Sequence, residues 1–292
     1  MAMRHKLFPY IVLLPTLIFL FAFTYFPLLR SAIDSLFDSR MASNAPPFVG
    51  LQNYQRLFAD SVFWRALLNN LAYILMTVIP GIVLALLLAV ALWENTSLNR
   101  WLRTAFFFPM IIPLVSAATL WLFIFMPGMG LLDYYLAKFF GPMNNNYLGM
   151  SQSALIALSV IGVWKFAGYY MLFFLAGLQS IPTSAREAAL MEGASRTQVF
   201  FYITLPLLRP TLSFVITIAL IYAITQIDHV PVMTQGGPNN ASTVLLYYIQ
   251  SLANDTHDLG KASAATFITL LLLFVFSMLN LRVLERGAHH ER

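Results

Sequence analysis

The sequence contains no cysteine among its 292 residues and few charged residues, with Asp, Glu, Lys and Arg together making up 10%. The absence of cysteine excludes disulfides, thiolate nucleophiles and cysteine-based metal sites. Soluble domains carry about 25% charged residues, so this chain has too few to cover a water-facing surface. Because 59% of the residues are hydrophobic and the mean hydropathy is +0.74, the composition indicates an integral membrane protein.

The sequence also lacks a run of basic residues, although its formal net charge is +5. Nucleic-acid binding depends on clustered Lys and Arg, and here those residues are scattered. We therefore expect no nucleic-acid partner. The positive charge is better explained by contact with the membrane surface.

Recognisable catalytic motifs are absent as well. The nearest approach to a P-loop is Gly260-Lys261, but Asp255 occupies the first glycine position and Ala262 the hydroxyl position. Neither H-E-x-x-H nor G-x-S-x-G occurs, and the five His residues show no metal-ligand spacing. We expect no catalytic residues, no metal site and no ATP hydrolysis on this chain.

What the sequence does contain is a series of long apolar runs. A membrane-crossing helix needs about 20 mostly apolar residues. Six runs are long enough or nearly so: 7–29, 66–93, 104–132, 151–177, 211–227 and 262–281. The fourth is interrupted only by Lys165. The sequence thus predicts an all-α integral membrane protein with six transmembrane helices. We expect one transmembrane domain over residues 1–292, with a core at about 66–285 preceded by the span at 7–29.

The distribution of positive charge predicts the orientation. With the N-terminus inside, the inner segments carry Arg4, Lys6, Arg100, Arg103, Arg186, Arg196, Arg209, Arg282, Arg286 and Arg292. The outer segments carry Arg30, Arg40, Arg56, Arg65, Lys138 and Lys261. The excess favours cytoplasmic N- and C-termini by the positive-inside rule. The loop between the fourth and fifth spans then faces the cytoplasm.

That loop, "REAALMEGASRTQVFFYITLPLLRP" at 186–210, has the pattern of two capped helices. Ser184 and Glu187 have the spacing of a capping box, and Ser195 and Gln198 repeat it. Gly193 lies where a helix commonly ends in a left-handed residue. The pattern predicts a helix, a tight turn and a second helix. From the residues alone, the loop either connects two spans along the lipid headgroups or contacts a partner protein.

A resemblance favours the partner. Glu187-Ala188-Ala189, followed at fixed spacing by Gly193, Ile203 and Leu205-Pro206, resembles the EAA loop of binding-protein-dependent ABC importers. Further stretches are similar to carbohydrate permeases of the maltose and glycerol-3-phosphate type: "FVGLQNYQRLFAD", "RTAFFFPMIIPLVSAATLW", "WKFAGYYMLFFLAGLQSIP", "TQGGPNNAST" and "DLGKASAA". The similarity extends over nearly the whole chain.

The resemblance implies a permease subunit in a bacterial or archaeal inner membrane. Its coupling helix would contact an ATPase through Glu187, Ala188, Ala189, Leu190, Met191 and Gly193. ATP and magnesium would be bound by a dimer of separate ATPase subunits. The other partners implied are a second homologous permease, an extracytoplasmic solute-binding protein, a carbohydrate-type substrate and membrane lipid.

Lys165 lies near the middle of the fourth span. A charge at a helix centre costs about 2.5–3.5 kcal/mol on insertion scales, so such residues usually face protein or a water-filled cavity. Trp164 is adjacent, and Tyr169 shares a helix face with Lys165 at four-residue spacing. Lys165 either pairs with carbonyl groups as a structural lysine or lines the substrate path.

The resemblance to the maltose permease also implies substrate-contacting positions. They correspond here to Gly162, Lys165, Phe166, Tyr169, Ala219, Tyr222, Ala223 and Gln226. Tyrosine rings and the Gln226 amide suit a sugar. We predict that Trp164, Lys165, Tyr169, Tyr222 and Gln226 line the path, and that Lys165, Tyr169, Tyr222 and Gln226 face one shared space.

An alternative function is a self-sufficient secondary transporter or channel. It would use Asp228, His229 and Lys165 in proton or ion transfer. This alternative predicts an internal repeat of spans, and none is visible in the sequence. Asp228 and His229 are more simply expected at the water interface, since Pro231 and Gly236-Gly237-Pro238 follow them.

Overall fold

A computed structural model describes residues 2–40, 46–141 and 145–288, and within these ranges the ordered backbone is almost entirely helical. In chain order the elements are α1 (Ala2–Leu20), the π-helix η1 (Phe21–Tyr25), α2 (Phe26–Asp34), α3 (Gln52–Phe58), α4 (Ser61–Ala91), α5 (Ser97–Ile111), α6 (Leu114–Ile124), α7 (Leu131–Phe140), α8 (Ala154–Ser180), α9 (Thr183–Met191), α10 (Arg196–Val199), the π-helix η2 (Phe200–Thr204), α11 (Leu205–Leu207), α12 (Arg209–Thr225), α13 (His229–Met233), α14 (Leu245–Asn254) and α15 (Leu259–Ala288). The predicted inner-side charge Arg292 lies outside the described residues.

In the described ranges, four helical stretches are long and apolar enough to cross a membrane, or up to six if two bent pairs each count as one span. The four are Val12–Asp34, Ser61–Ala91, Ala154–Ser180 and Leu259–Leu279. The bent pairs are Ser97–Ile111 with Leu114–Ile124, and Arg196–Leu207 with Arg209–Thr225. The all-helical membrane class is therefore observed, whereas the count of six depends on treating each bent pair as one span.

The predicted third span is not a continuous helix, because α5 and α6 meet at an angle of 100°. Pro113 explains the break. A residue before proline is disfavoured in the helical conformation, and Ile112 is extended, with φ −68° and ψ 129°. Pro113 also has no N–H to donate to the carbonyl of Pro109, four residues earlier.

The chain divides into two compact units, residues 1–64 with 248–272 and residues 65–247 with 273–292. The prediction of one domain over residues 1–292 stays a prediction. In the first unit, the carboxylate of Asp60 accepts hydrogen bonds from Lys261 Nζ at 2.5 Å and from the Tyr248 hydroxyl at 2.7 Å. Burial acts to raise the pKa of Asp60, but these hydrogen bonds outweigh it and hold that pKa below its usual value. An ion pair between Arg56 and Asp258 lies in the same unit.

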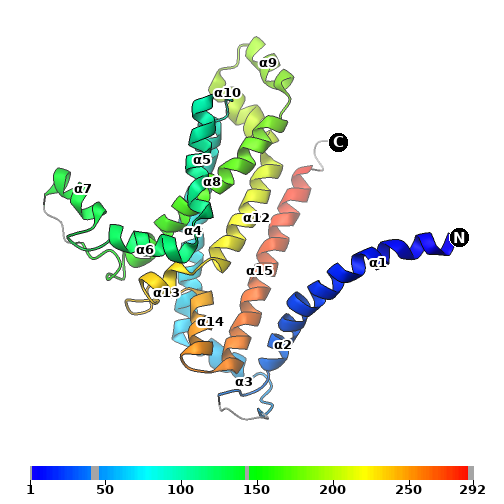
Figure 1. The fold of residues 1–292 in the computed structure, drawn as a ribbon, viewed down its shortest axis with the longest axis vertical. Coiled ribbons are helices and arrows are strands. Elements are labelled where there is room, and N and C mark those ends of the chain that lie inside the picture. The colour runs from blue at the N-terminus through cyan, green and yellow to red at the C-terminus, as the bar shows by residue number, and fades with distance from the viewer. Residues whose placement is uncertain (1, 41–45, 142–144, 289–292) are drawn as a thin grey trace. The chain divides into compact units, whose positions relative to one another are not determined.

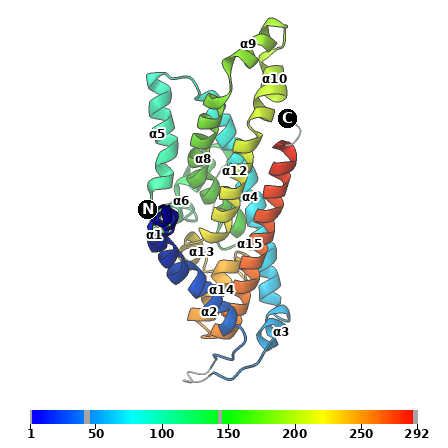
Figure 2. The ribbon, with the colours of Figure 1, turned by 90° about the vertical axis from the view of Figure 1, so that its right-hand side faces the viewer.

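In the second unit, the most buried element is α8, which packs against α5 and α12 (Figure 1). Gly168 brings α8 against α5, because a Cβ added there would lie 1.8 Å from the carbonyl oxygen of Phe106. Gly177 does the same toward α12, where an added Cβ would lie 2.5 Å from Thr211 Oγ1. Within this unit, α9 and α10 lie at one end and α13 lies toward the other (Figure 2).

Candidate functional site

The hairpin of α9 and α10 begins at Thr183, after Pro182. The predicted capping box of Ser184 and Glu187 is wrong, because Ser184 lies inside the first turn of α9. Pro182 occupies the N-cap position, and no side chain makes a capping hydrogen bond there. Proline close to a helix start is common, since its fixed φ suits the first turn.

The end of α9 confirms the prediction for Gly193, which has φ +87°. The N–H of Gly193 donates to the carbonyl of Leu190 at 3.1 Å, and the N–H of Ala194 donates to the carbonyl of Ala189 at 3.0 Å. This pair of bonds defines a Schellman motif, in which a left-handed residue lets the chain satisfy the last carbonyls of a helix. Gly193 thus sets the sharp reversal after α9.

The second capping box is also confirmed. The Ser195 hydroxyl accepts from the Gln198 N–H at 3.3 Å, and the Gln198 side-chain oxygen accepts from the Ser195 N–H at 2.7 Å. The helical path then continues through α10, η2 and α11. It bends by 66° at Leu208 before α12 begins.

The hairpin presents an exposed, partly apolar surface. No residue of α9 is buried, and the side chains of Met191 and Leu190 are 88% and 47% exposed. Glu187 and Ala188 are exposed as well, whereas Ala189 is half-buried. The six predicted ATPase-contacting residues therefore lie together, five on α9 and Gly193 in the turn that follows it. Such a surface suits contact with another protein.

Lys165 is almost fully buried, at 4% exposure, and its ammonium group is surrounded by carbonyl groups. Nζ donates to the carbonyls of Pro109 at 3.2 Å, Met110 at 3.3 Å and Ile112 at 2.5 Å. These carbonyls lie at the C-terminal end of α5, where a helix leaves acceptors without intrahelical partners. A cation at this end also interacts favourably with the negative end of the helix dipole. Lys165 thus pairs with carbonyl groups, as in the structural alternative from the sequence, and its place on the substrate path stays a prediction.

The tyrosines of the predicted path do lie together. The ring centroids of Tyr169 and Tyr222 are 5.9 Å apart, and Tyr222 stacks on Phe166 at 5.1 Å. Gln226 ends α12 and is half-buried. Trp164 contacts a different ring, that of Trp121, at 5.6 Å. The structure therefore groups Tyr169 with Tyr222 and gives Trp164 a separate neighbour.

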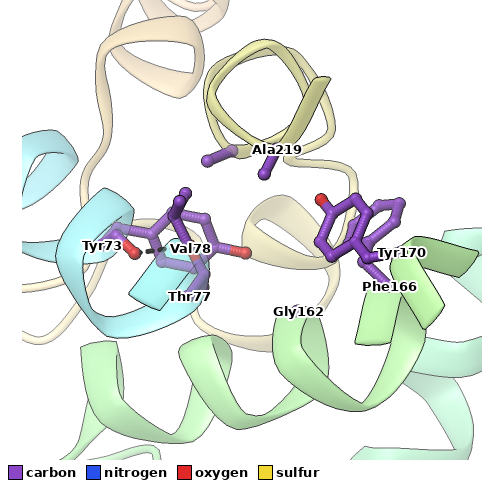
Figure 3. Close-up of a pocket in the computed structure, with 8 residues that line it drawn as sticks. Tyr73, Thr77, Val78, Gly162, Phe166, Tyr170 and Ala219 are labelled. Atoms are coloured by element: carbon purple, nitrogen blue, oxygen red, sulfur yellow. Dashed lines mark hydrogen bonds between the residues drawn. The ribbon is translucent and has the colours of Figure 1, made fainter. Parts of the chain in front are cut away.

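A small cavity of about 10 Å³ lies between α4, α8 and α12 (Figure 3). It is lined by Tyr73, Thr77, Val78, Gly162, Phe166, Tyr170, Ala219 and Ala223. Four of the eight positions implied by the maltose-permease resemblance, Gly162, Phe166, Ala219 and Ala223, are among them. At Gly162 the space is tight, because an added Cβ would lie 2.9 Å from the Tyr73 hydroxyl. A cavity of this size holds at most about one water molecule.

The α4 side of this cavity was not predicted from the sequence. Tyr73 and Thr77 lie four residues apart, so they share one face of α4, and they are buried at 3% and 8% exposure. Two polar side chains at helical spacing in a mostly apolar span are a signal that could have identified this face.

His229 was expected at the water interface, but it is buried at 1% exposure, whereas its neighbour Asp228 is exposed. Its Nε2 lies 3.1 Å from the Tyr73 hydroxyl, and its Nδ1 has no hydrogen-bond partner within the described ranges. Burial lowers the pKa of His229 from 6.5 to about 4, so the ring is neutral at pH 7. His229 therefore belongs to the packed interior rather than to a proton-transfer pair with Asp228.

No group of three or more His, Cys, Asp or Glu side chains among the described residues could hold a metal ion.

Comparison with protein families matches residues 81–288 to the family described as binding-protein-dependent transport system inner membrane component. A probable ABC transporter permease protein of Bacillus subtilis, YurN, is 31% identical over 291 residues, covering 98% of this chain and 99% of its own length. The sn-glycerol-3-phosphate transport system permease protein UgpA of Escherichia coli is 31% identical over 291 residues, covering 99% of this chain and 97% of its own.

Two solved structures share the fold. The crystal structure of a bacterial ABC transporter involved in the import of the acidic polysaccharide alginate contains a chain that matches with a TM-score of 0.83 and 24% identity, over 98% of this chain and 97% of that one. A second alginate transporter structure, in complex with an alginate pentasaccharide-bound periplasmic protein, matches with a TM-score of 0.80 and 23% identity, over 100% of this chain and 96% of that one.

Proposed function

The chain belongs to the family of binding-protein-dependent transport system inner membrane components, and we propose that it forms half of the translocation path of an ATP-driven importer of a sugar or sugar derivative. In this proposal the chain is a non-catalytic permease subunit, and α9 is the coupling helix that transmits the work of ATP hydrolysis.

The observation that carries the proposal is the exposed hairpin of α9 and α10. The Schellman turn at Gly193 and the capping box at Ser195 give this loop a defined shape without support from buried side chains of α9. At the end of α9, Met191 at 88% exposure offers an apolar side chain that a partner can cover. We propose that an ATPase covers this surface.

The proposed role as a permease subunit also implies the partners of this chain. Two ATPase subunits bind ATP and magnesium, a second homologous permease completes the path, and a solute-binding protein delivers the substrate from outside. With six spans, each bent pair crossing once, both termini would lie on the same side of the membrane as the hairpin of α9 and α10, and the excess of Lys and Arg makes that side the cytoplasm in this proposal. The periplasmic protein in one alginate transporter structure supports this arrangement by analogy of fold.

The substrate class is supported by the names of the similar proteins, which refer to sn-glycerol-3-phosphate and to alginate. Tyr169, Tyr222 and Phe166 supply the aromatic faces that suit sugar rings. The cavity of about 10 Å³ is smaller than any sugar, so transport requires these side chains to move or the second permease to supply most of the site. Lys165 does not indicate an anionic substrate, because its ammonium group is bonded to carbonyls.

The test is charge reversal on α9, followed by uptake in cells that express the complete transport operon. Glu187→Lys is expected to abolish uptake while the protein remains in the membrane, because the reversed charge lies on the surface assigned to the ATPase. Asp255→Lys, which reverses an exposed charge in the link between α14 and α15 and does not line the groove beside α9, is expected to retain uptake.

Wild-type uptake by Glu187→Lys would remove the coupling-helix assignment. The purified complex should contain an ATPase, and the chain alone should not bind ATP. Solute transport by this chain alone in liposomes would instead favour the secondary-transporter alternative.

A further inference from the structure

The short link between α4 and α5, residues 92–96, is fixed to α5 by Arg103. The Arg103 guanidinium donates to the carbonyls of Leu92 at 2.6 Å and 2.9 Å, of Trp93 at 2.9 Å and of Glu94 at 3.1 Å. Leu92 is itself buried in the core of the second unit. Hydrogen bonds from a charged donor are shorter and stronger than those between neutral groups, so four of them hold the link firmly to α5.

Trp93 in this link contacts α9. The Arg186 guanidinium lies over the Trp93 ring, 4.4 Å from its centroid, and both side chains are half-buried. A cation stacked on tryptophan is attracted to the negative face of the ring, and the attraction is stronger where water is excluded. Among the residues that the structure describes, no other side chain of α9 makes a hydrogen bond, an ion pair or a ring contact.

The contact spans open space rather than a packed interface. A groove of about 580 Å³ lies beside it, lined by residues of α4, α8, α9, α10 and η2 together with Trp93 and Glu94 of the link. Arg186 and Leu190 line it from α9, and Arg196 lines it from α10. The link and α9 lie at the same end of this unit (Figure 2). Although α9 also packs against η2, none of its residues is buried. Within the described ranges, the stacked pair is the polar or ring contact that its side chains make with the rest of the unit.

We propose that Arg186 and Trp93 form a strut that holds α9 at a fixed angle and carries its displacement to α4 and α5 through the link that Arg103 pins. This inference rests on the proposed function, in which an ATPase moves α9. Breaking the strut leaves Leu190 and Met191 exposed for docking, so the ATPase still assembles. The movement of the ATPase then displaces α9 alone and does not reach α4 and α5, so ATP is hydrolysed without import.

The experiment uses the whole importer, with both permeases, both ATPases and the binding protein, reconstituted in liposomes. The readout is the number of ATP molecules hydrolysed per solute imported. Trp93→Ala and Arg186→Ala are each expected to raise this ratio about fivefold, the change in an equilibrium that corresponds to the loss of one cation–π contact. Trp93→Phe keeps an aromatic face and should restore most of the coupling. The double variant should be no worse than either single variant, because both remove the same contact.

Arg100→Ala is the matched control, since Arg100 is an exposed arginine of α5 whose side chain bonds to Ser97 and does not line the groove. It should leave the ratio unchanged. An unchanged ratio in Trp93→Ala and Arg186→Ala would overturn the strut, and so would an equal effect of Arg100→Ala. If the wild-type chain fails to co-purify with an ATPase, the proposed function fails; if the wild-type complex is coupled and the variants match it, only the strut fails.

Discussion

Two glycines of the second unit show how differently its parts are determined. At Gly168 the backbones of α8 and α5 touch, so an added Cβ would lie 1.8 Å from the Phe106 carbonyl oxygen. At Gly193 an added Cβ would meet nothing within 4 Å, but the backbone has φ +87°. The first glycine is required by what packs against it, whereas the second is required by its own conformation. Packing therefore determines the membrane core, and local backbone rules determine the hairpin.

The largest expected effect comes from changing the two glycines in parallel. Gly168→Ala should destabilise the protein by about 3 kcal/mol or more, since backbone atoms cannot rotate away as a side chain would. This outweighs the roughly 1 kcal/mol that alanine gains over glycine in a helix. Gly193→Ala should cost only about 1 kcal/mol, the strain of a left-handed alanine. The thermal midpoint of each variant in detergent measures both effects.

Equal losses of thermal stability in the two variants would contradict the comparison. Limited proteolysis adds a control, because Gly193→Ala should increase cleavage near residue 193 while the core stays intact. Gly168→Ala should instead increase cleavage throughout the second unit.

A second prediction extends the comparison to charge, because protonation of the buried His229 ring lowers the free energy of unfolding. Its pKa is about 4 in the folded protein and 6.5 in its usual state, so between these values the unfolded chain binds more protons. Stability is therefore complete above pH 6.5 and is lost as the pH falls toward 4, by about 3 kcal/mol in total. Thermal midpoints between pH 7 and pH 5 should fall in the wild type. The fall should be smaller in His229→Gln, and parallel slopes would contradict this explanation.

A smaller effect is expected at Lys165. Lys165→Met replaces the ammonium group with an apolar side chain of similar length and leaves the carbonyls at the end of α5 without a donor. Loss of the partner of a buried acceptor costs about 1–3 kcal/mol, so the midpoint should drop by an amount equivalent to about 2 kcal/mol. Lys165→Arg should recover part of it. If Lys165→Met lost import completely while its thermal midpoint was unchanged, Lys165 would instead be assigned to the substrate path.

Sequence reasoning succeeded where structure is decided locally. Gly193 and the capping box of Ser195 and Gln198 follow rules that act within a few residues, and both are observed. Four of the six apolar runs likewise coincide with helical stretches that are long and apolar enough to cross a membrane. The break before Pro113 was missed, although the effect of proline on the preceding residue is also local and was available from the sequence.

Contacts between distant segments could not be read in the same way. Lys165 meets the carbonyl of Pro109, 56 positions away, and Tyr73 meets His229, 156 positions away. Neither pairing leaves a periodic signal in the sequence. The contact between Arg186 and Trp93 is equally unpredictable, since no residue near Trp93 in the sequence indicates which helix will pack beside it. Equal helical spacing does not determine what each residue meets: Lys165 bonds to carbonyls of α5, whereas the ring of Tyr169 lies near that of Tyr222.

The carbonyls that Lys165 occupies have a consequence for the membrane as a barrier. A broken helix in hydrocarbon usually needs water to satisfy its freed backbone groups, and a file of water is a route for protons. Here the carbonyls of Pro109, Met110 and Ile112 are satisfied by an amine from α8. These three carbonyls at the 100° bend therefore need no file of water, and so leave no route for protons of their own.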